Sequence, residues 1–204
     1  MERCFIFAAG DFFGLRERPA PGDLVIAADA GYRLCRRRGI DPALVLGDLD
    51  SMPEPSGVPV QRVPVEKDDT DTMLAVKLGL ERGCREFYLY GGTGGKRLDH
   101  TLANFQALLY LRRSGARGWL YGQGERYTAI SGDSITFPAR ERGILSVFCL
   151  GADAKDVSIL GGQYPLHHAV LTADFPLGVS NHFVGQPITV SVREGSLLIG
   201  AVDD

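Results

Sequence analysis

The feature that most constrains the fold is a change in hydrophobic periodicity near Gly122. Before this residue, short apolar runs alternate with helical stretches, whereas no later segment carries a convincing helical stripe. Strands that alternate with helices are typical of a mostly parallel sheet, and period-two strands separated by turn residues are typical of a sandwich or barrel. The sequence therefore predicts a mostly parallel α/β domain over 1–122, followed by a smaller all-β sandwich or barrel domain over 123–204.

The elements expected in the first half follow from its apolar runs and its glycines. Residues 4–9 and 24–28 are nearly continuous apolar runs, as in strands that are covered on both faces. Further strands are expected at 44–46, 61–65, 86–90 and 119–121, and helices at 32–38, 70–82 and 98–113. Gly39 and Gly83 stand where helix C-terminal caps belong.

The second half is expected to contain strands only. Residues 188–192 alternate between apolar and polar side chains, and Glu194-Gly195 predicts a turn back into 196–202. This pattern predicts a terminal β-hairpin. Further strands are expected at 144–150 and 157–160.

Charge and composition exclude several classes of protein. A formal charge of −3 argues against nucleic-acid binding, because phosphate contacts require a basic surface. The apolar runs are far shorter than the roughly 18–20 residues that span a bilayer, which argues against a membrane protein. The N-terminus lacks the layout of a signal peptide, and the four cysteines are scattered without a CxxC pair. We expect reduced thiols in a cytoplasmic protein.

Several aspartates lie at the ends of the expected strands or at the starts of the expected helices. In a parallel sheet the active site lies just beyond the carboxyl ends of the strands, which is where these aspartates would be. Asp29 follows 24–28, Asp48 and Asp50 follow 44–46, Asp71 stands at the start of 70–82, and Asp99 opens 98–113. Crowded carboxylates repel one another, and a divalent cation such as Mg²⁺ relieves that repulsion while bridging to phosphate oxygens.

Each of these aspartates also has an ordinary structural explanation. Asp99, like Asp69, could be a helix N-cap, and Asp48 and Asp50 could be turn residues. Asp29 could cap a strand-to-helix junction. The metal-site hypothesis depends on the combination, because several strand ends in one half terminate in acid.

A glycine loop joins the strand at 86–90 to the following helix. It consists of Gly91, Gly92, Thr93, Gly94, Gly95, Lys96 and Arg97. Glycines let backbone N–H groups approach a phosphate, and the helix N-terminus behind them favours negative charge. The loop matches neither the Walker A pattern nor GxGxxG. It predicts a phosphate site, although glycine clusters also occur in plain turns.

Taken in order, these motifs resemble the thiamine pyrophosphokinase family. The segments that carry the resemblance are AADAGYRL (27–34), GDLDS (47–51), EKDDTDT (66–72), GGTGGKRLDHTLAN (91–104) and VSN (179–181). The resemblance implies that ATP donates a pyrophosphoryl group to the hydroxyl of thiamine, giving thiamine diphosphate and AMP. It also implies Mg²⁺ and a homodimer whose active site lies between the α/β domain of one subunit and the β domain of the other.

The resemblance assigns roles to individual residues. Asp48, Asp50 and Asp71 would bind magnesium with Asp29 nearby, and Asn104 would join the loop from Gly91 to Arg97 in holding ATP. Asp99 would meet thiamine, and Asp71 and then Asp99 are the candidates for accepting the hydroxyl proton. Ser180 and Asn181 would belong to the thiamine pocket.

The chain departs from the family pattern at two positions. Lys96 intervenes between the glycines and Arg97. Tyr164 stands where many relatives carry a tryptophan that stacks on thiamine, and it could also be a core tyrosine.

Two other functions could use the same residues. A regulatory nucleotide-binding module would keep the glycine loop but would not need acids at so many strand ends. A metal-dependent phosphohydrolase could use the same aspartates without an acceptor. The pocket turn at Val179-Ser180-Asn181 in the β half favours a transferase with two substrate sites.

Overall fold

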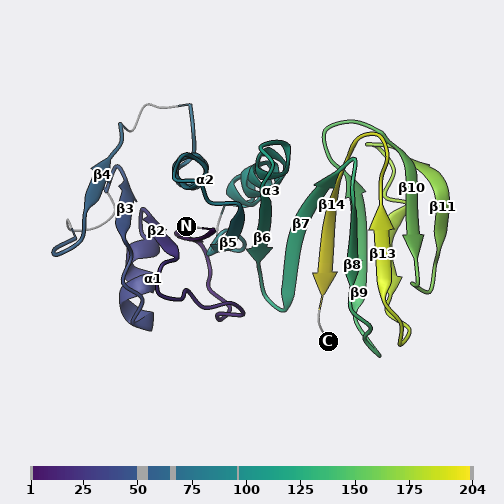
Figure 1. Ribbon diagram of the computed structural model, residues 1–204, viewed down its shortest axis with the longest axis horizontal. Helices are drawn as coiled ribbons and strands as arrows, with labels where there is room; N and C mark the ends of the chain where they lie inside the picture. Colours follow the sequence, from purple (N-terminus) through teal and green to yellow (C-terminus); the bar gives the residue numbers. More distant parts are fainter. Residues whose placement is uncertain (1, 50–54, 65–67, 96, 203–204) are drawn as a thin grey trace. The chain divides into compact units, whose positions relative to one another are not determined.

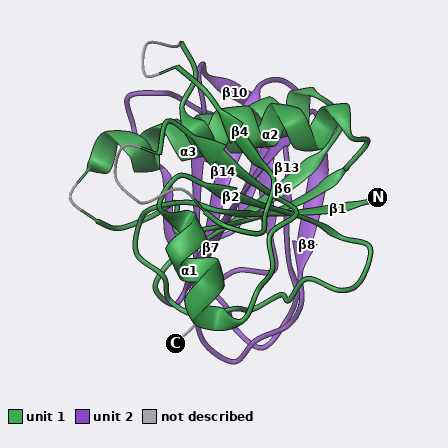
Figure 2. Ribbon diagram, turned by 90° about the vertical axis from the view of Figure 1, so that its left-hand side faces the viewer, with its two compact units in different colours: residues 1–123 green, residues 124–204 purple. Residues whose placement is uncertain are grey.

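The computed structural model describes residues 2–49, 55–64, 68–95 and 97–202. The chain divides into two compact units, Met1–Gln123 and Gly124–Asp204, which are drawn in green and purple in Figure 2. The first unit is an α/β domain and the second is all-β, so the predicted fold class is confirmed. No helix among the described residues combines the length and the apolar character that a membrane crossing requires.

The first unit is built on a parallel sheet in the strand order β6-β5-β1-β2-β3-β4 (Figure 1). The strands are β1 (Arg3–Phe7), β2 (Leu24–Ala28), β3 (Leu44–Gly47), β4 (Val60–Arg62), β5 (Glu86–Tyr90) and β6 (Arg117–Tyr121). All five pairings in this order are parallel. Because β1 pairs with both β2 and β5, the strand order reverses at β1, and ligands of such sheets bind at the carboxyl ends near this reversal.

Three helices cover the sheet: α1 (Gly31–Arg38), α2 (Asp71–Glu81) and α3 (Leu98–Arg113). Helix α1 lies on one face, and α2 and α3 lie side by side on the other (Figures 1 and 2). Gly39 ends α1 in the left-handed conformation with a φ of 64°, as its position predicted. Under α1 the core is aromatic: Phe7 stacks on Tyr90 and Tyr90 stacks on Tyr121, with ring centroids 5.4 and 4.8 Å apart.

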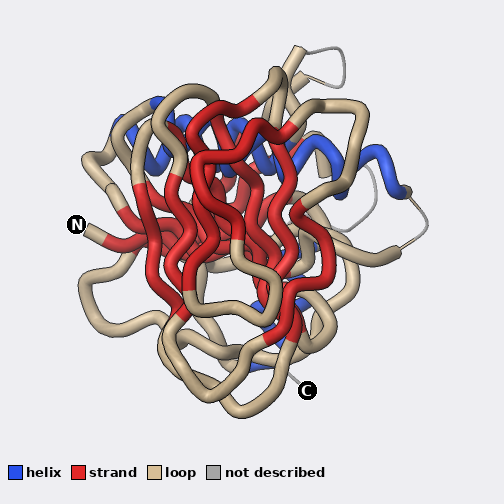
Figure 3. The backbone as a smooth tube through the Cα atoms, turned by 90° about the vertical axis from the view of Figure 1, so that its right-hand side faces the viewer, coloured by secondary structure: helices blue, strands red, loops and turns tan. Residues whose placement is uncertain are grey.

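The second unit consists of two four-stranded antiparallel sheets (Figure 3). The first has the order β12-β9-β14-β7, from β7 (Glu125–Ser131), β9 (Ile144–Cys149), β12 (Gly178–His182) and β14 (Ser196–Val202). The second has the order β11-β10-β13-β8, from β8 (Ser134–Phe137), β10 (Ala154–Leu160), β11 (Leu166–Leu171) and β13 (Ile188–Ser191). Apolar side chains of both sheets form the core of this unit, among them Val147, Ile199, Ile159 and Val190.

The predicted terminal hairpin is wrong. β13 pairs with β10 and β8 in one sheet, whereas β14 pairs with β7 and β9 in the other. Residues 192–195 carry the chain between the sheets, and on the way Val192 N–H donates to the carbonyl of Asp133 at 3.0 Å. Period-two alternation identifies the two faces of a strand but not its partners, so the short connection was misread as a hairpin turn.

Candidate functional site

A pocket of about 270 Å³ lies at the carboxyl ends of the parallel strands, between the glycine loop and the start of α2. Its walls come from segments that are far apart in the sequence: the ends of β1 and β2, the start of α2, and the glycine loop with the N-terminal part of α3. The residues predicted for the site that line it are Asp29, Asp71, Gly91, Gly92, Gly94, Gly95, Arg97 and Asn104. The fold therefore brings most of the predicted α/β-domain residues into one cavity.

Asp29 is held at the strand ends by its backbone. It adopts a φ of 48°, which is uncommon for a residue other than glycine, and its N–H donates to the carbonyl of Leu46 at 2.7 Å. A Cβ atom on Gly47 would lie 3.1 Å from the Cα of Asp29, so the ends of β2 and β3 touch here. Asp48, half-buried, follows directly. Asp50 lies outside the described residues.

Asp71 is the first residue of α2, and the preceding residue caps that helix. Thr70 Oγ1 accepts a hydrogen bond from Met73 N–H at 3.1 Å, which satisfies one of the unpaired N–H groups of the first turn. Asp69, considered as a cap on sequence grounds, instead accepts from Lys77 Nζ at 2.6 Å. Asp71 is therefore not used as the cap, and it lines the pocket.

The glycine loop packs against the end of β1 so closely that no side chain fits at Gly91. A Cβ on Gly91, whose φ is 68°, would lie 2.4 Å from the carbonyl oxygen of Ala8. The buried Asn104 of α3 donates from Nδ2 to the carbonyl of Gly92 at 2.7 Å. Thr93 is buried, and its Oγ1 donates to the carbonyl of Tyr121 at 3.4 Å rather than lining the pocket. Lys96 lies outside the described residues.

Arg97 and Asp99 form an exposed ion pair beside the pocket. Arg97 Nε donates to Asp99 Oδ1 at 3.2 Å, and a second contact joins Arg97 Nη2 to Asp99 Oδ2. The bond to Arg97 lowers the pKa of Asp99 below its usual value. A carboxylate with a lowered pKa is a weaker proton acceptor, and Asp99 does not line the pocket although its neighbour His100 does. Asp71, the other candidate base, does line the pocket.

The carboxylates fit a cation that is shared with a bound phosphate. Among the described residues, no three Asp, Glu, His or Cys side chains are grouped closely enough to hold a metal ion by themselves. Among the described residues, two carboxylates line the pocket, those of Asp29 and Asp71. Protein-bound Mg²⁺ commonly takes one or two carboxylates and completes its shell with phosphate oxygens and water, so this donor set suits a magnesium–nucleotide complex.

In the second unit the predicted thiamine residues form a small cluster of their own. Asn181 is buried, and its side chain accepts from Tyr164 N–H at 3.0 Å and donates to the carbonyl of Tyr164 at 2.7 Å. This clamp presents the Tyr164 ring to solvent, where the residue is 58% exposed, so the alternative of a core tyrosine is wrong. Ser180 has a φ of 60°, and its N–H donates to Ser146 Oγ at 3.1 Å. Ser180 and Asn181 lie in β12, not in a turn.

Several pocket residues were not singled out as site residues from the sequence. They are Ala8, Ala9, Gly10, Ala28, Thr70, Thr72 and Thr101. The signal that could have found the first three is Gly10-Asp11 directly after the apolar run at 4–9, the same strand-end position that singled out Asp29.

Comparisons with known proteins match each of the two units to a domain of one enzyme family. The family model for the thiamin pyrophosphokinase catalytic domain matches residues 20–120, and the model for the thiamin pyrophosphokinase vitamin B1 binding domain matches residues 134–197. The thiamine pyrophosphokinase of Bacillus subtilis (strain 168) is 26% identical over 184 residues, 86% of each chain.

Solved structures of the same class share the fold. The crystal structure of thiamine pyrophosphokinase from Bacillus subtilis matches with a TM-score of 0.90 at 25% identity, covering 100% of both chains. The thiamin pyrophosphokinase of Geobacillus thermodenitrificans matches with a TM-score of 0.85 at 22% identity, over 99% of this chain and 98% of that one. The yeast thiamin pyrophosphokinase matches with a TM-score of 0.77 at 13% identity, over 98% of this chain and 86% of that one, and at such identity the likeness is one of fold.

Proposed function

The chain belongs to the thiamine pyrophosphokinase family, whose two domain models together match well over half of it, and we propose that it transfers the pyrophosphoryl group of ATP to the hydroxyl of thiamine, giving thiamine diphosphate and AMP. The observation that carries this proposal is the pocket of the first unit. It joins a glycine loop and Arg97, which suit a polyanion, to the carboxylates of Asp29 and Asp71, which suit a divalent cation or a cationic acceptor.

We propose that residues 1–122, nearly the whole first unit, form the ATP-binding catalytic domain. In our proposal the loop from Gly91 to Gly95, Arg97 and Asn104 hold the nucleotide, while Asp48, Asp50 and Asp71 would bind magnesium, with Asp29 nearby. Mg²⁺ bound there would neutralise phosphate charge. Asn104 acts through the loop, because its amide fixes the Gly92 carbonyl at 2.7 Å. The N-terminus of α3 behind the loop adds a favourable dipole for phosphate.

The reaction needs positioning and charge neutralisation more than covalent participation by the protein. The thiamine hydroxyl oxygen attacks the β-phosphorus of ATP, the bond from that phosphorus to the α–β bridging oxygen breaks, and AMP leaves with the bond's electron pair. The hydroxyl proton passes to a carboxylate. We assign this step to Asp71, with Asp99 as the second candidate, because the ion pair with Arg97 lowers the pKa of Asp99.

We propose that residues 123–204, which include the whole second unit, form the thiamine-binding domain. Tyr164 offers an exposed aromatic face to the cationic thiamine ring, and Asn181 fixes its backbone. We propose that Ser180, beside Asn181 in β12, also contacts thiamine. We propose a homodimer in which this cluster completes the active site of the other subunit. We also propose that the protein works in the cytoplasm, as its four free cysteine thiols favour a reducing compartment.

The direct test is AMP release from Mg-ATP by the purified protein, with and without thiamine. We expect AMP only when thiamine is present, together with an equal amount of thiamine diphosphate. AMP or ADP released without thiamine would instead identify a phosphohydrolase. Nucleotide binding without turnover would identify a regulatory module.

Replacing Tyr164 by alanine should raise KM for thiamine about tenfold, because a cation stacked on an aromatic face contributes about 0.5–2 kcal/mol. KM for ATP should stay within a factor of two. Tyr164→Phe should behave like the wild type, since the ring face is retained. Phe175→Ala is the matched control, because Phe175 is a similarly exposed aromatic residue of the same unit, 64% exposed. An equal effect in both alanine variants would contradict stacking by Tyr164.

A further inference from the structure

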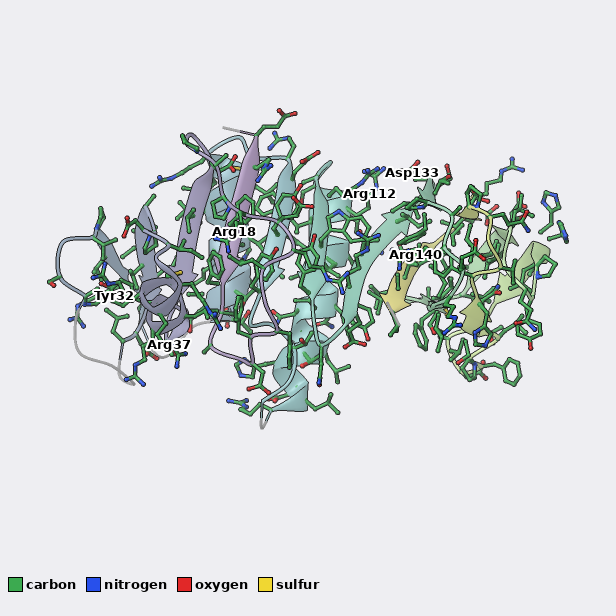
Figure 4. The ribbon with its side chains drawn as sticks, turned by 90° about the horizontal axis from the view of Figure 1, so that it is seen from below. Arg18, Tyr32, Arg37, Arg112, Asp133 and Arg140 are labelled. Atoms are coloured by element: carbon green, nitrogen blue, oxygen red, sulfur yellow. The ribbon has the colours of Figure 1, made fainter. Side chains whose placement is uncertain are left out.

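The connection between β1 and β2 runs alongside the glycine loop and is bonded to it repeatedly. Gly10 N–H donates to the carbonyl of Gly91 at 2.8 Å. The hydroxyl of Tyr90, the residue directly before the loop, accepts from Glu17 N–H at 2.9 Å and donates to the Glu17 carbonyl at 3.0 Å. Further on, Arg3 donates to the carbonyl of Arg18 at 2.9 Å (Arg18 is labelled in Figure 4). These hydrogen bonds therefore join the connection to β5, which leads into the glycine loop, and to β1, which lies beside β5.

Asp11, which belongs to this connection, forms a hydrogen bond with the C-terminal part of the glycine loop. Its Oδ2 accepts a hydrogen bond from Gly95 N–H at 2.7 Å. A Cβ on Gly94 would lie 2.7 Å from the same oxygen and 3.0 Å from the Cβ of Asp11, so only glycine fits there without a shift. Gly94 and Gly95 both have positive φ angles, 72° and 75°. The backbone of a glycine can adopt many other conformations, so a contact is needed to hold it in this one.

The carboxylate of Asp11 approaches the loop from outside the pocket. Gly94 and Gly95 line the pocket together with Arg97, whereas Asp11 is absent from its walls. Asp11 instead lines a neighbouring hollow with Gly10 and Phe12. The contact thus holds the loop without occupying the space where a ligand would lie.

We propose that Asp11 is a positioning residue for the nucleotide, acting through Gly95. This inference rests on the proposed function, in which the loop holds the phosphates of ATP. A loop fixed before binding loses less conformational entropy when the nucleotide arrives, and this raises affinity without any new contact to the ligand. Asn104 fixes the loop at Gly92, and Asp11 fixes it three residues further on.

The test compares Asp11→Ala with Asp11→Asn and with a control. Asp11→Ala removes the acceptor, and we expect KM for Mg-ATP to rise about tenfold, with kcat and KM for thiamine within about twofold of the wild type. Asp11→Asn keeps an oxygen that can accept from Gly95, so its KM for Mg-ATP should stay within about threefold. Asp23→Ala is the control, because Asp23 lies in the same connection and its contacts, with Ala20 N–H at 2.7 Å and with Arg3 Nη2 at 3.1 Å, lie away from the loop.

Amide hydrogen exchange at Gly95 in the nucleotide-free protein gives a readout that does not depend on activity. We expect exchange about tenfold faster in Asp11→Ala than in the wild type or in Asp23→Ala. Unchanged exchange at Gly95, or a KM for Mg-ATP that is unchanged or lower in Asp11→Ala, would overturn the inference. A wild-type protein without thiamine-dependent AMP release would count against the proposed function, and exchange at Gly95 would still decide whether Asp11 holds the loop.

Discussion

Replacing Asp71 by asparagine should lower kcat about a thousandfold or more, because a carboxylate that lines the pocket loses both its charge and its ability to accept a proton. Asparagine keeps the size of the side chain, so the cavity keeps its shape. The helix should survive the change, because Thr70 rather than Asp71 caps α2. The loss of a favourable charge at the helix N-terminus should cost at most about 1 kcal/mol of stability.

Steady-state AMP formation at saturating Mg-ATP and thiamine would measure this effect, and circular dichroism would confirm that the variant is folded. Asp69→Asn is the matched control, since it neutralises a neighbouring carboxylate that pairs with Lys77 outside the pocket. We expect the control to keep near-wild-type kcat. A folded Asp71→Asn protein with comparable kcat would remove Asp71 from the mechanism.

Replacing Gly31 by alanine should destabilise the first unit by at least about 3 kcal/mol, because the added methyl group has no space. Its Cβ would lie 1.8 Å from the carbonyl oxygen of Phe7 and 2.5 Å from its carbonyl carbon. Both atoms belong to the backbone of β1, which cannot turn aside as a flexible side chain can. Helix α1 would have to move off the sheet, and Asp29, two residues earlier, would move with it.

Urea denaturation followed by the fluorescence of Trp119, the single tryptophan, would report on the first unit. Gly39→Ala at the other end of α1 is the control, because nothing lies within 4 Å of its Cβ position. That variant should lose only the roughly 1–2 kcal/mol that a left-handed conformation costs an alanine. Equal destabilisation by the two substitutions would show that α1 tolerates a shift away from β1.

The sequence predicts the α/β unit better than the all-β unit for a physical reason. The helix over 98–113 and the strand over 86–90 agree with α3 and β5, because glycines and a sustained apolar stripe mark their ends. In the second unit, β7, β8, β11 and β12 were missed. In β11 the exposed His167 and His168 interrupt the apolar residues, and β12 includes the polar Ser180-Asn181. Their pairing depends on partners far along the chain, which local alternation does not encode.

Site residues that lie at the ends of strands or helices can be predicted from the sequence. Residues whose role depends on a tertiary hydrogen bond cannot. Asp29 and Asp71 are visible in the sequence because acids directly follow or precede regular elements. Asp11 also follows an apolar run, but its hydrogen bond to Gly95 is not visible in the sequence, because the two residues are 84 positions apart. The clamp by Asn181 on Tyr164 is likewise a tertiary feature. Only the folded chain shows which polar side chains hold other groups in place.

The position of β14 sets the order in which the protein can be assembled during translation. β14 pairs with β7 along its whole length, from Glu125 opposite Val202 to Ser131 opposite Ser196, and on its other edge it pairs with β9. The interior strand of this sheet is thus synthesised after every other strand of its unit. The first unit can fold while the ribosome is still working, whereas the second waits for β14 to emerge. A stop codon before Ser196 would remove that interior strand rather than a fraying tail, and would leave β7 and β9 as open edges that invite aggregation.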